Sequence, residues 1–172
     1  ENIISYTVLD SSQIKKNIMK LNKLKKIKDN KIKIRFLDYN KKSSYKKGNY
    51  TRMLSSHTFE HFDNFENNFL KLLPLLKKNA IISTALPCDP GLTWRFLQFF
   101  SYLKQKNIYK WKNLKQKDLD DARDHITPVQ NIFKIINYYF YKIKTIYFPF
   151  IIPIIGINIF LIIQVKLSDF KR

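Results

Sequence analysis

Two short apolar runs separated by a helical pattern constrain this chain more than any other feature. The first, Tyr50 to Ser55, ends in small polar residues, and the second, Ala80 to Leu86, is mostly apolar and ends at Pro87. Two strands joined by one helix form a parallel βαβ unit, and such sheets bind ligands just beyond the carboxyl ends of their strands. The sequence therefore predicts a site formed by residues 55–61 and 87–91. The run from Ala80 to Leu86 is predicted to be a central strand covered on both faces.

Two more strand patterns precede this unit. Residues 2–9 are rich in β-branched and aromatic side chains and stop at Asp10, and residues 31–37 alternate basic and apolar side chains and stop at Asp38. Alternation with period two is typical of a strand with one solvated face. Asp10 and the two serines after it are good N-cap residues, so a helix is expected through about Lys26. A polar loop is expected over residues 40–48.

Helical patterns fill the middle of the chain. Asp63 and Glu66 have the spacing of a capping box, and Pro74 is expected to end the helix that they begin. Residues 91–106 carry aromatic side chains at helical spacing, which indicates either a lid over the site or, more commonly, a place in the core. The polar, basic residues 104–117 are predicted to form an excursion.

The start of the last helix is marked by three residues. Thr127 is expected to be the cap, Pro128 the first helical residue and Gln130 the capping-box partner. The sequence predicts a helix from there to about Tyr141.

The tail of the chain is apolar. Residues 146–165 carry no charged side chain and are long enough to cross a bilayer. However, Pro149, Pro153, Gly156 and Asn158 interrupt the run near its middle. Two antiparallel strands, about residues 142–150 and 157–167, account for the same residues without lipid, and we predict this hairpin.

The net charge of +19, from 32 basic and 13 acidic residues, is large. It is typical of proteins that bind RNA, DNA or an acidic membrane surface. Here lysine accompanies asparagine and isoleucine along the whole chain and arginine is scarce, which indicates a compositional bias rather than a phosphate-binding surface. Nucleic acid is therefore not the favoured partner, and peripheral membrane contact stays open.

The few cysteine and histidine residues limit the disulfides and metal sites that the chain can form. The single cysteine, Cys88, excludes an internal disulfide, and a buried, inert thiol is its expected state. The three histidines lack the spacing of a zinc site, so no metal is predicted. Because no signal-peptide pattern is present, we expect a cytoplasmic protein.

The order of these features resembles that of class I S-adenosylmethionine-dependent methyltransferases of the type 11 kind. The resemblance covers nearly the whole chain and is strongest at residues 50–62, 75–87 and 124–126, and then at residues 148–150 and 158–160. It implies an α/β, Rossmann-like, mostly parallel sheet with flanking helices and a C-terminal antiparallel β-hairpin. Residues 1–172 would form a single domain, in which residues 91–127 would be a lid or substrate excursion.

The resemblance also implies contacts with S-adenosylmethionine. Asp10 would bond the ribose hydroxyls and Asp38 would neighbour the adenine amino group. The remaining implied cofactor residues are Ser11, Tyr39 beside the adenine ring, and Ser55, Ser56 and His57 at the sulfonium end. Carboxylates at strand ends can accept hydrogen bonds from hydroxyl and amino groups. As an alternative, Asp10 and Asp38 are ordinary helix and turn starters.

The sequence departs from the family at the cofactor loop. The family's first strand and glycine-rich loop would precede Glu1, and none of the three glycines is placed to replace that loop. The glycine-rich turn before the family's fifth strand is replaced by Lys77, Lys78 and Asn79. We therefore expect the sequence to be an N-terminally truncated, partial methyltransferase domain.

Methyl transfer is an in-line displacement that needs orientation, exclusion of water and, for a protonated acceptor, a base. The candidate bases are His57, Asp124 and His125, whereas His61 is expected to be structural. The predicted activity is methyl transfer to a small-molecule or lipid/glycan-precursor acceptor. One alternative is an RNA-directed methyltransferase or RNA-binding module that uses the lysines of residues 15–33 and 41–47. Another is a non-catalytic protein associated with membranes through residues 146–165.

Overall fold

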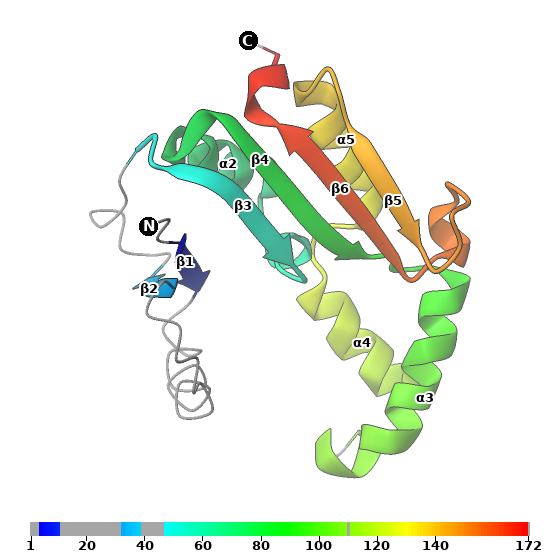
Figure 1. The fold of residues 1–172 in the computed structure, drawn as a ribbon. Coiled ribbons are helices and arrows are strands. Elements are labelled where there is room, and N and C mark those ends of the chain that lie inside the picture. Colours follow the sequence, from blue (N-terminus) through cyan, green and yellow to red (C-terminus); the bar gives the residue numbers. More distant parts are fainter. Residues whose placement is uncertain (1–3, 11–31, 39–46, 110, 172) are drawn as a thin grey trace. The chain divides into compact units, whose positions relative to one another are not determined.

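The computed structural model describes residues 4–10, 32–38, 47–109 and 111–171 (Figure 1). The chain divides into two compact units, residues 1–46 and 47–172.

The first unit contains a parallel pair of strands. β1 (Ile4–Asp10) and β2 (Ile32–Asp38) run in register from the pair Ile4 and Ile32 to the pair Asp10 and Asp38. Both predicted strands are therefore confirmed. The helix expected after Asp10 lies outside the described residues, as does nearly all of the loop expected over residues 40–48.

The second unit is built on a four-stranded sheet. Its strands lie in the order β3 (Tyr50–Ser56), β4 (Leu76–Pro87), β6 (Phe160–Lys166) and β5 (Lys144–Phe148). β3 and β4 are parallel, while β6 pairs antiparallel with both β4 and β5. The predicted βαβ unit and the predicted C-terminal hairpin are both confirmed.

The N-cap residue of the helix between β3 and β4 lies one residue later than expected, at Asn64 instead of Asp63. A 3₁₀ turn, η2 (Phe59–His61), precedes α2 (Phe65–Leu72), and the side chain of Asn64 accepts a hydrogen bond from the Asn67 amide. The capping box of Asp63 and Glu66 was therefore wrong, because Glu66 instead accepts a hydrogen bond from the Tyr139 hydroxyl. α2 ends, as expected, just before Pro74, which lies in η3 (Leu73–Leu75).

The next two helices project from the sheet at the lower end of β4 in Figure 1. They are α3 (Leu92–Tyr109) and α4 (Leu114–Asp124). The helix predicted over residues 91–106 is confirmed, but its expected place in the core was wrong. Phe96 is 63% exposed, and Phe99 and Phe100 are also exposed. Helical spacing of aromatic residues identifies an apolar face without showing what packs on it.

The last helix is α5 (Val129–Tyr139), and Pro128 is its N-cap residue instead of its predicted first helical residue, without a side-chain cap. The prediction of Thr127 as the cap was wrong. Its hydroxyl donates to the Phe62 carbonyl at 2.7 Å, and its amide donates to the Glu60 carbonyl at 2.9 Å. Thr127 thus ties the start of α5 to the segment that follows β3.

The core lies between the sheet and the two helices α2 and α5, which cover the same face of it (Figure 1). Phe69 and Ile132 are fully buried there, and the ring of Phe69 lies 5.9 Å from that of Phe59 and 6.2 Å from that of Phe140. Along β4 the residues on one face are buried, whereas those on the other are half-buried. The prediction that this run is a central strand is confirmed, because β4 lies between β3 and β6, but its second face is only half-buried rather than fully covered.

The hairpin turn is organised by one polar side chain. Asn158 is fully buried, and its amide oxygen accepts from the Phe150 amide at 3.0 Å. Its amide nitrogen donates to the carbonyls of Ile152 and Ile154, both at 2.8 Å.

Two short 3₁₀ turns complete the second unit. They are η4 (Ile155–Ile157), within the hairpin turn, and η5 (Leu167–Asp169), after β6. No helix in the described part of the chain has the length and apolar character that a membrane span needs.

Candidate functional site

Two acidic residues end the two strands of the first unit side by side. Asp10 and Asp38 are partners in the parallel register, each the last residue of its strand. Each of the two residues therefore ends its strand, as expected, and the parallel register places them at the same carboxyl edge. Ser11 and Tyr39, the other cofactor residues predicted here, lie outside the described residues.

The predicted residues of the second unit lie at the carboxyl ends of β3 and β4. Ser56 pairs with Ala85, and the His57 amide donates to the Ala85 carbonyl at 3.2 Å. His57 has a φ of 49°, a left-handed conformation that is unfavourable for a residue with a side chain. The Ser55 hydroxyl oxygen is buried and has no hydrogen-bond partner among the described residues.

A buried carboxylate lies immediately after this edge, in the turn η2. Glu60 is only 3% exposed, and within the described part of the chain neither of its carboxylate oxygens has a hydrogen-bond partner. Its Oε1 lies 3.5 Å from Nδ1 of His57 and 4.0 Å from Nε2 of His61. Glu60 lies within the predicted site segment 55–61, but no role of its own was predicted for it, because its sequence neighbours do not reveal that it is buried.

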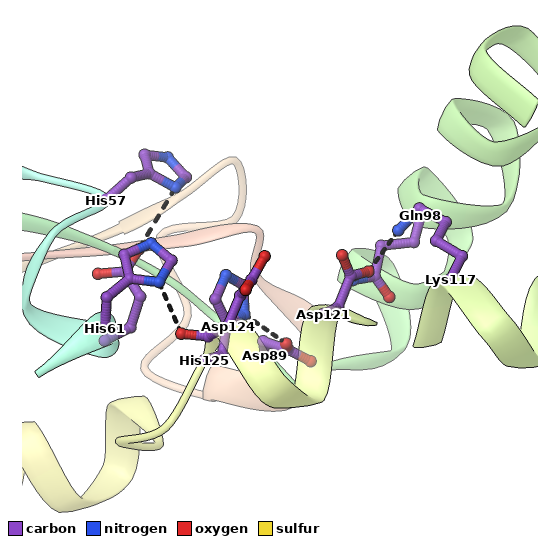
Figure 2. Close-up of polar contacts among 9 residues, drawn as sticks. His57, His61, Asp89, Gln98, Lys117, Asp121, Asp124 and His125 are labelled. Carbon is purple, nitrogen blue, oxygen red and sulfur yellow. Dashed lines mark hydrogen bonds and ion pairs between the residues drawn. The ribbon is translucent and has the colours of Figure 1, made fainter. Parts of the chain in front are cut away.

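An imidazole and a carboxylate pair beside Glu60. Nδ1 of His125, at the end of α4, lies 2.8 Å from Oδ2 of Asp89, in the loop after β4 (Figure 2). This hydrogen bond raises the pKa of His125, with further contributions from the charges of Asp89, Glu60 and Asp121, whereas burial opposes the rise. The Asp89 carboxylate thus favours the protonated form of the His125 imidazole.

The three predicted catalytic residues lie near the carboxylates of Glu60 and Asp89. They are His57, Asp124 and His125. The ring of His61 lies 5.3 Å from that of His125, and the Trp94 ring lies 6.4 Å from that of His57 and 6.5 Å from that of His125. Asp124 contributes its backbone, because its carbonyl oxygen accepts from Nδ1 of His61 at 2.6 Å. His61 thus belongs to the cluster rather than standing apart from it, while the predicted catalytic role of Asp124 stays a prediction.

Two neighbouring cavities open beside this cluster. A cavity of about 190 Å³ is lined by Glu60, Asp89 and His125, among others. A second cavity, of about 360 Å³, lies between α3 and α4 and is lined in part by Arg95 and Asp118. Both cavities include Asp89, so the pair of Asp89 and His125 lies where they meet.

A polar link holds the two projecting helices together. Gln98 on α3 donates to Oδ2 of Asp121 on α4 at 2.7 Å, and the Lys117 ammonium also donates to that oxygen (Figure 2). Lys117 is only 4% exposed, so its charge is compensated inside the helix pair. This link fixes the walls of the larger cavity.

The lone cysteine is not part of this chemistry. Cys88 is fully buried, and burial raises the pKa of its thiol to about 11. A thiol with such a pKa is not a nucleophile at neutral pH. The predicted burial of Cys88 is confirmed, and its inertness stays a prediction.

Comparison with known proteins identifies the fold. No protein-family model matches the chain, and no curated protein sequence matches it. An S-adenosylmethionine-dependent methyltransferase from Thermotoga maritima aligns with 95% of this chain and 72% of its own length, at 12% identity and a TM-score of 0.53.

Two other solved structures align as well, each at 12% identity. The methyltransferase domain of the citrinin polyketide synthase gives a TM-score of 0.56, and the CurJ carbon methyltransferase gives 0.57. This chain spans only 39% and 42% of those two structures. At such identities the likeness concerns the fold, and this chain has the α/β, Rossmann-like fold of the class I methyltransferases.

Proposed function

We propose that this chain carries out methyl transfer from S-adenosylmethionine to a small-molecule acceptor. The observation that carries the proposal is the fold shared with methyltransferase structures over nearly the whole chain. The edges of the sheets add support, because polar residues gather where α/β folds bind their ligands.

The residues at these edges fit the proposed cofactor. Asp10 and Asp38 end neighbouring parallel strands, and their carboxylates are suited to accept hydrogen bonds from the ribose hydroxyls and the adenine amino group. Ser55 offers a buried hydroxyl whose oxygen has no hydrogen-bond partner among the described residues. Ser55, Ser56 and His57 are proposed to orient the sulfonium end. The cofactor supplies the electrophilic methyl group, and the chain supplies orientation and exclusion of water.

The acceptor is proposed to bind in the cavities beside His125. The larger one, at about 360 Å³, has a size typical of small-molecule sites. The imidazole of His125, oriented by Asp89, can take a proton from an acceptor that carries one. His57 and the Asp124 carboxylate are the other proposed bases. In this proposal the helix pair within residues 91–127 serves as the lid of the acceptor site.

Calorimetric titration with S-adenosylmethionine tests the proposal. The titrations would use this chain, a form extended upstream in its gene, and the variants D10N and D38N, with D63N as a matched control because Asp63 is exposed. We expect D10N and D38N each to weaken binding of S-adenosylmethionine at least about tenfold, since each replaces a charged hydrogen-bond acceptor with a neutral amide. D63N should leave this binding unchanged. The absence of binding by both the given and the extended chain would refute the proposal.

A second candidate function is contact with a membrane surface. The turn between β5 and β6 exposes Ile151, which is 89% accessible, together with Phe150, Ile152 and Ile154. Exposed apolar clusters of this kind on a basic protein are suited to the interface of an anionic bilayer. Flotation with anionic vesicles should recover the protein and should fail for I151D/I152D; equal recovery of both would exclude this turn. The alternative based on RNA rests on residues 15–33 and 41–47, nearly all of which lie outside the described residues.

A further inference from the structure

A buried carboxylate and two imidazoles converge beside the smaller cavity. Glu60, His61 and His125 each offer one ligand atom, and these atoms lie within 4.8 Å of one another. Glu60 is 3% exposed, and in the described residues no group donates a hydrogen bond to either of its oxygens. An ionised carboxylate without hydrogen bonds is costly to bury unless a cation compensates it. His57, whose Nδ1 lies 3.5 Å from Oε1 of Glu60, supplies such a charge only when its imidazole is protonated, so a bound cation would compensate the carboxylate more fully.

The hydrogen bonds of the two rings show which nitrogen is available. A carbonyl oxygen can only accept, so Nδ1 of His61 carries the proton in its 2.6 Å contact with the Asp124 carbonyl. Nδ1 of His125 likewise donates to the Asp89 carboxylate at 2.8 Å. In the neutral form each ring then has its lone pair on Nε2. For His61 this atom lies 4.0 Å from Oε1 of Glu60, so two electron-rich atoms flank a position suited to a cation.

We propose that Glu60, His61 and His125 bind a divalent transition-metal ion of the zinc class. Glu60 would supply a carboxylate oxygen and the two histidines their Nε2 atoms. Metal-bound histidines commonly donate their other N–H to a carboxylate or to a backbone carbonyl, and Asp89 and Asp124 provide one of each. His57 is an ion-pair neighbour of Glu60 at 3.5 Å and is not a ligand.

The geometry requires a small contraction. Two atoms bonded to one zinc ion at about 2.1 Å lie about 3.4 Å apart in a tetrahedral site. The present separations, 4.0 Å between His61 Nε2 and Glu60 Oε1 and up to 4.8 Å within the set, must therefore close by about 0.6 to 1.4 Å. The His61 side chain is 43% exposed and has room to rotate toward Glu60. Three protein ligands leave a fourth position, and Glu60 and His125 both line the cavity of about 190 Å³.

The ligand atoms, one carboxylate oxygen and two imidazole nitrogens, determine which metal ion is favoured. Imidazole nitrogen suits zinc, cobalt and nickel, whereas magnesium prefers oxygen ligands alone. An ion here would offer its open position to an oxygen or nitrogen donor of a small molecule in the cavity. The inference concerns binding only and does not depend on the proposed methyl transfer, so the two are tested separately.

Cobalt and zinc titrations of the chelator-treated chain, prepared without a histidine tag, test the site. We expect one cobalt ion per chain with the visible absorption of a four- or five-coordinate complex, displacement of cobalt by zinc, and no competition from magnesium. E60Q and H61N should each weaken zinc binding about 100-fold or more, a larger loss than for outer partners. Because the His61 side chain is exposed, H61N is expected to fold, which circular dichroism would check.

Two matched variants serve as controls. E66Q makes the same chemical change at an exposed glutamate on α2, and H57N removes the ion-pair neighbour that is not a ligand. Both should bind one zinc ion as tightly as the unchanged chain. The proposal would be overturned if the unchanged chain did not bind zinc tightly, or if E60Q and H61N still bound it tightly. Loss of zinc binding in H57N alone would overturn it as well.

Discussion

Nδ1 of His125 lies 2.8 Å from Oδ2 of Asp89, although 36 residues separate the two in the chain. His125 is the C-cap residue that follows α4, and Asp89 follows β4 at the carboxyl edge of the sheet. The contact fixes the orientation of the imidazole and leaves its Nε2 free. It also joins the projecting helices to the sheet beside the buried carboxylate of Glu60.

Removing the charge of Asp89 should weaken metal binding without abolishing it. In D89N the amide no longer polarises the ring of His125, and loss of such an outer partner typically lowers metal affinity 10–100-fold. Zinc titration in competition with a chelator of known affinity would measure the change. D118N is the control, because Asp118 is exposed and lines only the larger cavity. Equal affinities for D89N and the unchanged chain would contradict an outer role for Asp89.

The turn after β4 should not accept a side chain at Gly91. A Cβ atom there would lie 2.5 Å from the Cys88 carbonyl oxygen and 3.2 Å from that of Gly156. Since backbone atoms cannot move aside easily, we expect G91A to lower the free energy of unfolding by about 1–3 kcal/mol. Urea denaturation followed by circular dichroism would measure it.

Gly156 provides the control for this change. A Cβ atom at Gly156 meets nothing within 4 Å, so G156A should leave stability within about 0.5 kcal/mol of the unchanged chain. Equal losses in the two variants would show that the turn at Gly91 does not pack against η4.

The buried amide of Asn158 should be essential to the hairpin turn. N158A leaves the carbonyls of Ile152 and Ile154 without donors, which should cost about 2–3 kcal/mol. N158D should cost more, because a carboxylate oxygen would then face these carbonyls. The exposed Asn131 on α5 is the control, and N131A should be nearly neutral. Thermal unfolding of the three variants gives the ranking, and a neutral N158D would contradict it.

The strands and the hairpin could be predicted because their signals are local. β-branched and aromatic residues identify β1, alternation identifies β2 and a short apolar run identifies β3, and each ends in a polar residue. The break at Pro149 and Gly156 separates the two strands of the tail. The helix caps were predicted less accurately, because contacts with residues distant in the sequence determine which side chains cap a helix. Glu66 bonds the hydroxyl of Tyr139, 73 residues away, instead of capping α2.

The site was harder to predict than the fold. His57, Asp124 and His125 stood out as polar residues near expected strand or helix ends, and the structure brings them together. The burial of Glu60 and the pairing of Asp89 with His125 depend on contacts between distant segments, so no local pattern indicates them. For the same reason the histidine spacing could not reveal the cluster of Glu60, His61 and His125.

The buried thiol of Cys88 should react slowly and should make stability depend on pH. Burial raises its pKa from 9.0 to about 11, so at a given pH below 9 the folded chain holds about 100-fold less thiolate than the unfolded chain. Alkylation by iodoacetamide at pH 8 should therefore be at least about 100-fold slower in buffer than in denaturant.

The direction of the pH effect on stability follows from the same shift. Above pH 9 the thiol of the unfolded chain loses its proton while that of the folded chain keeps it, so the unfolded state binds fewer protons and stability falls as pH rises toward 11. C88A removes this contribution, and comparing the two chains cancels the titration of the lysines and tyrosines. The free energy of unfolding of the unchanged chain, relative to that of C88A, should be constant below pH 9 and should decrease from pH 9 to about 11. A constant difference across that range, or alkylation as fast in buffer as in denaturant, would show that Cys88 is accessible in the folded chain.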